Sequence, residues 1–162
     1  FRNERMLTLE QALLLIRKLG MGLNLELKAH AGDARQYIDA LESRLRKAEI
    51  DNGKLLISSF DRELLALMKT RAPQRPLGVL TEAVQEDTWA LARSLEAATI
   101  VAKHTCLSPE QVYQARRRGY QVVAYTANEP QEIGLLIQAG LNAVITDFPA
   151  RYYPNVKPAA GL

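Results

Sequence analysis

Two charged residues stand two positions apart in an otherwise apolar run, LNLELK at residues 23–28. If this run is a β-strand, Glu26 and Lys28 lie on one face with Asn24, and the leucines lie on the other. A carboxylate binds hard cations such as Mg²⁺ or Ca²⁺ through oxygen, and a neighbouring ammonium can neutralise a phosphate. The pair is therefore a candidate site for a metal-bound phosphate, although an exposed antiparallel strand would show the same alternation.

The elements around this run help to decide between the two interpretations. Six apolar runs are expected to form strands, and from the third onward each begins about 22 residues after the one before. Helical patterns fill the intervals and one precedes the first strand, with Thr8, Asp61 and Ser108 placed to cap their helices. The expected strands are 23–28, 55–59, 77–80, 98–102, 121–126 and 143–146, and the expected helices are 7–20, 33–50, 61–72, 86–96, 108–118 and 130–140. This alternation predicts an α/β fold with a parallel sheet.

Strands of a parallel sheet covered by helices are apolar, and five of the six runs largely follow that rule. LNLELK at 23–28 departs from it. An α/β barrel or an open α/β sheet places its ligand groups near the carboxyl ends of such strands. The departure favours a functional role for Glu26 and Lys28.

Composition predicts one ordinary globular domain over residues 1–162, with a loose tail at 155–162. The 162 residues are 48% hydrophobic and 24% charged, and the net charge of +3 gives little support to nucleic-acid binding. The single cysteine, Cys106, cannot form an internal disulfide, which favours a reduced, cytoplasmic location. No apolar run reaches the length of a membrane span. The chain begins at Phe1 rather than Met, so we expect it to belong to a longer polypeptide.

Several common site motifs are missing or misplaced. GMGLN at 20–24 contains a G-x-G, but it precedes a strand, whereas a dinucleotide-binding loop follows one. There is no P-loop and no G-x-S-x-G nucleophile turn. A zinc site is disfavoured because His104 and Cys106 are too close for a usual ligand pair.

The ordered strings TLEQAL, LNLELK, LLISSFD, VVAYTANEP and GLNAVITDFP resemble the glycerophosphodiester phosphodiesterase family, which folds as a TIM barrel. The resemblance implies that Glu26 is a metal ligand and that Lys28 faces the substrate phosphate. It also implies that Phe60, Tyr125 and Asn128 line the mouth of the pocket. Core packing of the aromatic rings and turn formation by Asn128 are the structural alternatives. Asp147 resembles a family signature too, or simply caps the barrel rim.

The chain also departs from the family pattern. The family's first strands carry a His-Arg-Gly motif, a Glu-x-Asp metal pair and a second histidine, and the two histidines act as general acid and base. A complete barrel takes about 250 residues, and this chain resembles strands three to eight, an incomplete TIM barrel of about six parallel strands. None of its residues matches a catalytic family position, and we expect His30 and His104 to be exposed loop residues.

The resemblance implies metal-dependent hydrolysis of glycerophosphodiesters, small-molecule substrates, to glycerol 3-phosphate and an alcohol by the full-length parent. The alternative is a non-catalytic α/β domain that binds a phosphorylated ligand or a partner. An intact open sheet would cover its edges, whereas a barrel fragment would leave the strands at 23–28 and 143–146 as open edges capable of self-association.

Overall fold

The computed structural model describes residues 5–28 and 32–152, which form an alternating series of helices and parallel strands. All six predicted strands and the helices between them are present. The strands are β1 (Leu23–Leu27), β2 (Leu55–Ser59), β3 (Leu77–Thr81), β4 (Thr99–Lys103), β5 (Gln121–Tyr125) and β6 (Ala143–Val144). The α-helices are α1 (Leu9–Leu19), α2 (Ala34–Lys47), α3 (Arg62–Arg71), α4 (Glu86–Ser94), α5 (Pro109–Arg117) and α6 (Gly134–Gln138).

Four short 3₁₀ helices lie in the connections, and they explain one difference from the prediction. They are η1 (Asn52–Lys54), η2 (His104–Cys106), η3 (Pro130–Ile133) and η4 (Pro149–Arg151). The helix expected over 130–140 is divided into η3, which has Pro130 in its first turn, and α6, which begins at Gly134. Short 3₁₀ segments of this kind are frequent at the ends of α-helices.

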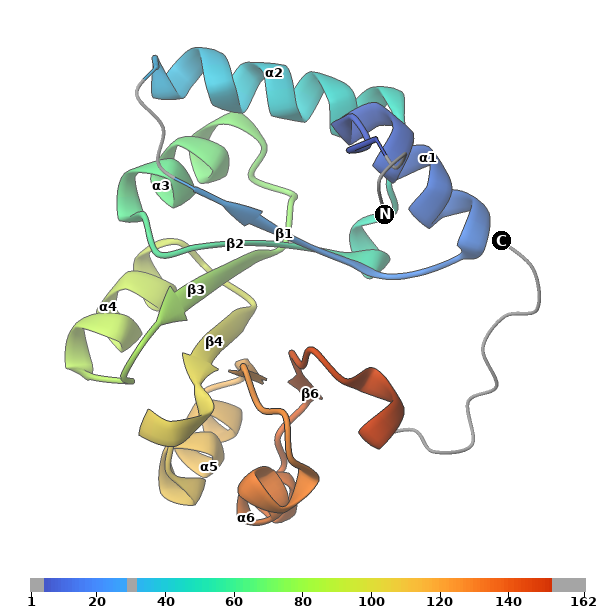
Figure 1. Cartoon of the computed structure of the whole chain (residues 1–162). Helices are drawn as coiled ribbons and strands as arrows, with labels where there is room; N and C mark the ends of the chain where they lie inside the picture. Colours follow the sequence, from blue (N-terminus) through green and yellow to red (C-terminus); the bar gives the residue numbers. More distant parts are fainter. Residues whose placement is uncertain (1–4, 29–31, 153–162) are drawn as a thin grey trace.

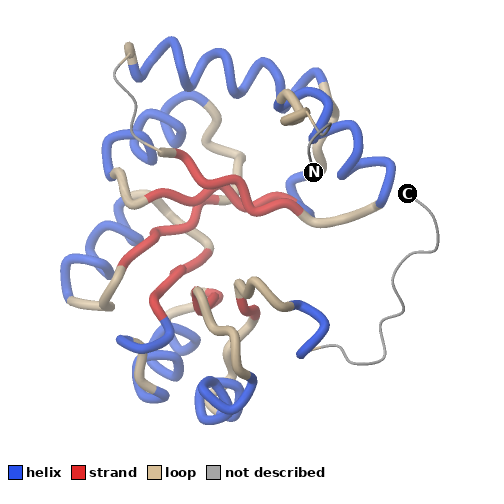
Figure 2. The backbone as a smooth tube through the Cα atoms, viewed as in Figure 1, coloured by secondary structure: helices blue, strands red, loops and turns tan. Residues whose placement is uncertain are grey.

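The strands form one sheet in the order β1-β2-β3-β4-β5-β6, and every pair is parallel. The sheet curls so that the strands line the inside and the helices cover the outside (Figures 1 and 2). We call this arrangement the half-barrel. Among the described residues β1 pairs only with β2, and β6 only with β5, so the sheet does not close on itself.

Side-chain caps set where the helices begin. Thr8 and Gln11 form a reciprocal capping box at α1, and Ser108 forms another with Gln111 at α5. The Asp61 carboxylate accepts hydrogen bonds from the first turn of α3. Each cap satisfies backbone N–H groups that have no partner within the helix, as the sequence predicted.

The main core lies between the sheet and the helices, on the outer face of each strand. On this face Ile57 is the register partner of Leu77, and Val79 is the register partner of Ile100; all four are almost completely buried. The inner face carries a second, smaller cluster formed by Leu56, Leu80, Val101, Val123, Tyr125 and Ile145. Strand alternation thus divides the chain between a packed outer layer and an inner surface that faces the axis of the curl.

A buried ion pair lies in the connections ahead of β2 and β3, at the amino end of the sheet. Arg75 is 8% exposed and its guanidinium donates two hydrogen bonds, of 3.0 and 3.3 Å, to the carboxylate of Glu42, which is 1% exposed. It also donates to the carbonyl of Ile50 and the side-chain oxygen of Asn52. These bonds join α2 to the connections before both strands, and they satisfy a charge that would otherwise be costly to bury.

Candidate active site

The carboxyl ends of five parallel strands meet at one edge of the half-barrel. The inner-face residues at or directly after these ends form what we call the mouth: Glu26, Lys28, Phe60, Glu82, Lys103 and Tyr125. In α/β barrels this edge is where ligand groups gather. The mouth therefore brings together four of the five residues that the sequence predicted for a site.

Glu26 lies on the inner face of β1, two residues after Asn24 and on the same side of the strand. Its register partner on β2, Ser58, lies on this face too and contacts Asn24. Ser58 Oγ donates a 2.9 Å hydrogen bond to Asn24 Oδ1. Glu26 is exposed, as is Lys28 just after the strand. Neither side chain forms a hydrogen bond or ion pair with another residue in the described part of the chain. Their charges are available to a ligand.

Phe60 and Tyr125 face each other across the mouth from the ends of β2 and β5. Their rings meet edge to face with centroids 6.0 Å apart, and Phe60 remains 50% exposed. The Tyr125 hydroxyl donates a 3.0 Å hydrogen bond to the carbonyl of Thr81, at the end of β3. Phe60 is thus a surface ring rather than a core residue, and Tyr125 is fixed against the inner cluster.

The electrostatic surroundings of Tyr125 link three strands. Its pKa is raised above the ordinary value, first by desolvation in the half-barrel and then by negative charge at Glu82, Cys106 and Glu26. Carboxylates from β1 and from the end of β3 therefore act on one hydroxyl from β5. This places Glu26 in the same electrostatic environment as the aromatic pair.

The side chain of Asn128 forms hydrogen bonds within the rim of the half-barrel. Its side-chain nitrogen donates to Asp147 Oδ2 at 3.0 Å, and its side-chain oxygen accepts from the backbone N–H of Asp147 at 3.0 Å. The same oxygen accepts from the Thr146 hydroxyl at 3.2 Å. The Asn128 side chain thus links two loops, through partners 18 and 19 positions away, rather than forming a local turn. This agrees with the rim position considered for Asp147, and contact of Asn128 with a substrate stays a prediction.

The described residues do not by themselves complete a divalent-cation site. Residues 5–28 and 32–152 contain no group of three or more histidine, cysteine, aspartate or glutamate side chains placed to hold a metal. Glu26 fits as one hard oxygen ligand. Glu49 and Asp51 spell Glu-x-Asp, but they precede β2 at the opposite end of the sheet, where Glu49 pairs with Arg17 at 2.9 Å. A cation bound at Glu26 would need further ligands.

His104 is not the exposed loop residue that was expected. It begins η2 directly after β4, and its side chain is only 13% exposed. Nδ1 lies 3.3 Å from the carbonyl of Tyr125, and Nε2 lies 3.6 Å from the carboxylate of Glu132. These partners are 21 and 28 positions away in the chain, so local sequence could not reveal the burial. His30 and the tail at 155–162 lie outside the described residues.

Sequence reasoning missed two charged members of the mouth, Glu82 and Lys103. Glu82 directly follows β3 and Lys103 is the last residue of β4, and each comes after an apolar run like those of the other strands. The alternation of side chains along the strands could have identified Glu82, which continues the inward-facing positions of Gly78 and Leu80. Lys103 is the register partner of Tyr125 and so lies on the same face. Both are exposed, and neither is paired with a described residue.

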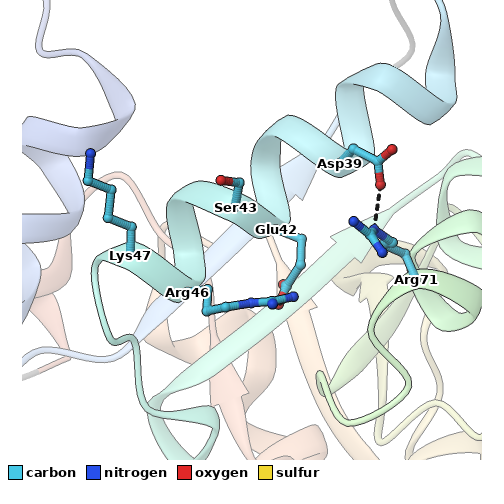
Figure 3. Close-up of a pocket in the computed structure, with 6 residues that line it drawn as sticks. All are labelled: Asp39, Glu42, Ser43, Arg46, Lys47 and Arg71. Atoms are coloured by element: carbon cyan, nitrogen blue, oxygen red, sulfur yellow. Dashed lines mark ion pairs between the residues drawn. The ribbon is translucent and has the colours of Figure 1, made fainter.

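A hollow on the outer surface is a poorer candidate. It has a volume of about 330 Å³ and is lined by Asp39, Glu42, Ser43, Arg46, Lys47 and Arg71 (Figure 3). Arg71 pairs with Asp39 there, and Glu42 is held by Arg75. The acidic side chains of this hollow are thus already paired within the protein.

The arginines of the basic run ARRRG at 115–119 contact other residues of the protein. Arg116 donates a 2.7 Å hydrogen bond to the carbonyl of Gly140. The guanidinium of Arg118 lies 4.6 Å from the centre of the Trp89 ring, and that of Arg117 lies 5.9 Å from the centre of the Tyr113 ring. The run packs against its own surroundings through hydrogen bonding and cation–π contacts.

The strands and helices form an incomplete TIM barrel, and Glu26 and Lys28 lie at the carboxyl edge of its sheet. Residues 1–151 match the glycerophosphoryl diester phosphodiesterase family, and the chain belongs to that family. A glycerophosphodiester phosphodiesterase of Caldanaerobacter subterraneus is 26% identical over 152 residues, which are 92% of this chain and 61% of the relative.

Solved structures give the same result. An Oleispira antarctica phosphodiesterase in complex with the product sn-glycerol-3-phosphate is 30% identical, with a TM-score of 0.84 over 91% of this chain and 60% of that one. A putative glycerophosphoryl diester phosphodiesterase of Silicibacter pomeroyi is 25% identical, with a TM-score of 0.79 over 88% of this chain and 53% of that one. The chain thus spans between about half and three fifths of the length of these proteins. Within residues 5–28 and 32–152, no helix has the length and apolar character needed to cross a bilayer.

Proposed function

We propose that the polypeptide containing this chain hydrolyses glycerophosphodiesters to glycerol 3-phosphate and an alcohol. The observation that carries the proposal is the position of Glu26 and Lys28 at the carboxyl end of β1, where neither pairs with a described residue, in a chain of the glycerophosphoryl diester phosphodiesterase family. The product bound by the Oleispira phosphodiesterase, sn-glycerol-3-phosphate, has the chemistry that this pair would recognise. The reaction breaks the phosphorus–oxygen bond to the alcohol and adds the elements of water.

The two side chains have different roles in this proposal. Lys28 neutralises negative charge that builds on the phosphoryl oxygens in the transition state, an effect worth about two to three orders of magnitude in rate. Glu26 supplies one oxygen ligand to a divalent cation, Mg²⁺ or Ca²⁺. When bound, such a cation polarises the phosphate and lowers the pKa of an attacking hydroxyl or water.

The proton transfers need groups that the mouth does not supply. His104 is engaged with Tyr125 and Glu132, and no histidine of the described residues lies on the inner face at the mouth. The acid and base are therefore assigned to the two strands that the family resemblance places ahead of residue 1. The chain contributes the phosphate-facing wall of the site.

The open sheet edges support this proposal over a non-catalytic open-sheet domain. Such a domain would cover its edge strands, whereas β1 and β6 each have a free edge among the described residues. In addition, α1 exposes apolar side chains, with Leu14 53% and Leu19 44% exposed. Both features fit a barrel that further strands complete.

The test is hydrolysis of glycerophosphocholine in Mg²⁺ or Ca²⁺, followed as release of glycerol 3-phosphate. The 162-residue chain alone should be inactive, and adding a segment with the two missing βα units should produce activity. In that reconstituted protein, Lys28→Met should lower the rate by at least about a hundredfold. Phosphate-ligand binding without hydrolysis would favour the non-catalytic alternative.

A further inference from the structure

A groove lies between α2 and α3 on the outer surface of the half-barrel. It consists of the hollow of about 330 Å³ described above and a second hollow of about 550 Å³, and the two share Asp39 and Arg71. We call it the α2–α3 groove. Both helices cover the outside of the sheet (Figure 1). None of the residues that line the two hollows belongs to the mouth, so a ligand bound here would leave the proposed substrate site free.

The α2 wall of this groove is a stripe of charged residues. Its members follow one another at intervals of four, three and four residues, which places them on one face of the helix: they are Arg35, Asp39, Glu42 and Arg46. At a rise of 1.5 Å per residue the stripe is about 17 Å long. An extended peptide advances about 3.3 Å per residue, so about five residues would span the stripe.

Both carboxylates of the groove are already paired with arginines. Asp39 pairs with Arg71, which reaches across from α3 (Figure 3). Glu42 is 1% exposed, and its two oxygens accept hydrogen bonds from the buried Arg75. Neither carboxylate therefore presents an unpaired negative charge to a ligand.

Three further basic side chains of the groove are open to a ligand. Arg35 and Lys47, near the two ends of α2, are exposed, and neither side chain forms a hydrogen bond or ion pair with a described residue. Arg46 is 71% exposed and lies 3.6 Å from Glu42, the carboxylate that Arg75 already binds. The groove thus has more positive than negative charge along its length, which complements a row of carboxylates.

The apolar surface of the two helices favours a peptide over a lipid bilayer as the occupant. A helix that binds a bilayer surface presents large apolar side chains beside its cations. All residues of α2 and α3 belong to the described part of the chain, and no large hydrophobic side chain of either helix is exposed. The groove therefore offers cations along a concave surface and nothing to insert into lipid.

We propose that the α2–α3 groove binds an extended acidic peptide segment of a partner protein. Carboxylates along the segment pair with Arg35, Arg46 and Lys47, and about five residues fill the length of the stripe. Because the groove lies outside the mouth, this binding does not depend on the proposed function. It gives the polypeptide a protein-binding surface on the outside of the half-barrel.

Fluorescence anisotropy of a labelled peptide tests this binding on the 162-residue chain. The ligand is a fluorescein-labelled hexapeptide of alternating glutamate and aspartate, and its neutral counterpart alternates glutamine and asparagine. The acidic peptide should bind at least about tenfold more tightly than the neutral one at low salt. The difference should shrink as the ionic strength rises from about 0.05 M to about 0.5 M, because salt screens exposed charges.

Two double variants with the same net charge separate the groove from general attraction to a basic protein. Arg35→Gln with Lys47→Gln should weaken binding of the acidic peptide at least about fivefold. Lys18→Gln with Arg93→Gln is the matched control, because these side chains are exposed, pair with no described residue and lie on α1 and α4. The control should bind the peptide as the wild type does, and both double variants should keep the wild-type free energy of unfolding.

Equal affinity for the acidic and neutral peptides would overturn the proposal. So would an equal loss of affinity in the two double variants, since the peptide would then respond to net charge rather than to the groove. Vesicles containing phosphatidylglycerol provide the last comparison. Vesicle binding that Arg35→Gln with Lys47→Gln weakens, in a chain that does not bind the acidic peptide, would assign the groove to a membrane surface and overturn the peptide proposal.

Discussion

Asn128 and Asp147 form two reciprocal hydrogen bonds across the rim of the half-barrel. The side-chain amide of Asn128 donates to the Asp147 carboxylate, and the backbone N–H of Asp147 donates back to the Asn128 side-chain oxygen, both at 3.0 Å. The two residues are 19 positions apart and follow adjacent strands, β5 and β6. This reciprocal pair fixes the two loops relative to each other.

Asn128→Ala should therefore destabilise the fold by about 1–2 kcal/mol, because it removes two side-chain hydrogen-bonding partners at once. The free energy of unfolding from urea titration measures the effect. Asn128→Asp should be at least as costly, since it places a second carboxylate beside Asp147. A stability equal to that of the wild type in both variants would contradict the rim assignment.

The buried pair of Arg75 and Glu42 should matter far more than an exposed pair. Arg75→Met removes both hydrogen bonds to the buried Glu42 carboxylate and leaves it only the 3.6 Å ion pair with Arg46. The loss should cost about 3–5 kcal/mol of unfolding free energy. Arg71→Met is the matched control, because Arg71 pairs with Asp39 where both side chains are about half exposed. It should cost about 0–1 kcal/mol. Similar losses of unfolding free energy in the two variants would show that the buried pair contributes no more to stability than the exposed pair.

Titration of Tyr125 tests its environment. In the folded state the hydroxyl stays neutral to a higher pH than in the unfolded state, because desolvation and the negative charge at Glu82 raise its pKa. The stability that depends on this group is therefore fully present below the ordinary tyrosine pKa of about 10, and it is lost as the pH rises through the folded value. Glu82→Gln should shift the Tyr125 titration, followed by ring NMR signals, toward the ordinary value. If the pKa of Tyr125 is the same in Glu82→Gln as in the wild type, the charge of Glu82 does not act on the Tyr125 hydroxyl.

The open edges of the half-barrel predict self-association of the chain in isolation. Within residues 5–28 and 32–152, β1 and β6 each have one edge that pairs with no other strand, and α1 presents exposed leucines. Light scattering should find dimers or larger species, and a segment with the two missing βα units should return the chain to a single 1:1 complex. Leu14→Lys should reduce association by charging the apolar face of α1. A chain that stays monomeric at high concentration would mean that the strand edges and the exposed face of α1 do not drive self-association.

Much of the fold was predictable because its determinants are local. Helix caps such as Thr8 and Ser108 and the regular spacing of apolar runs predicted the six α-helices and six strands of the described residues, but not the four 3₁₀ helices in the connections. The inward position of Glu26 followed from alternation within one strand. By contrast, the pairing of Arg75 with Glu42 spans 33 positions, and His104 is buried by residues from other loops. Glu82 was overlooked because its importance depends on Phe60 and Tyr125, which only the curled sheet brings near it.

The most direct test of the account is the rate of glycerol 3-phosphate release from glycerophosphocholine by the reconstituted protein, compared between wild type, Glu26→Gln and Glu96→Gln. Glu26→Gln should weaken divalent-cation affinity and lose most of the activity while the unfolding free energy stays close to that of the wild type. Glu96→Gln should retain full activity. A Glu26→Gln protein that hydrolyses the substrate at the wild-type rate in saturating Mg²⁺ and Ca²⁺ would contradict the assignment of the mouth as the phosphate site.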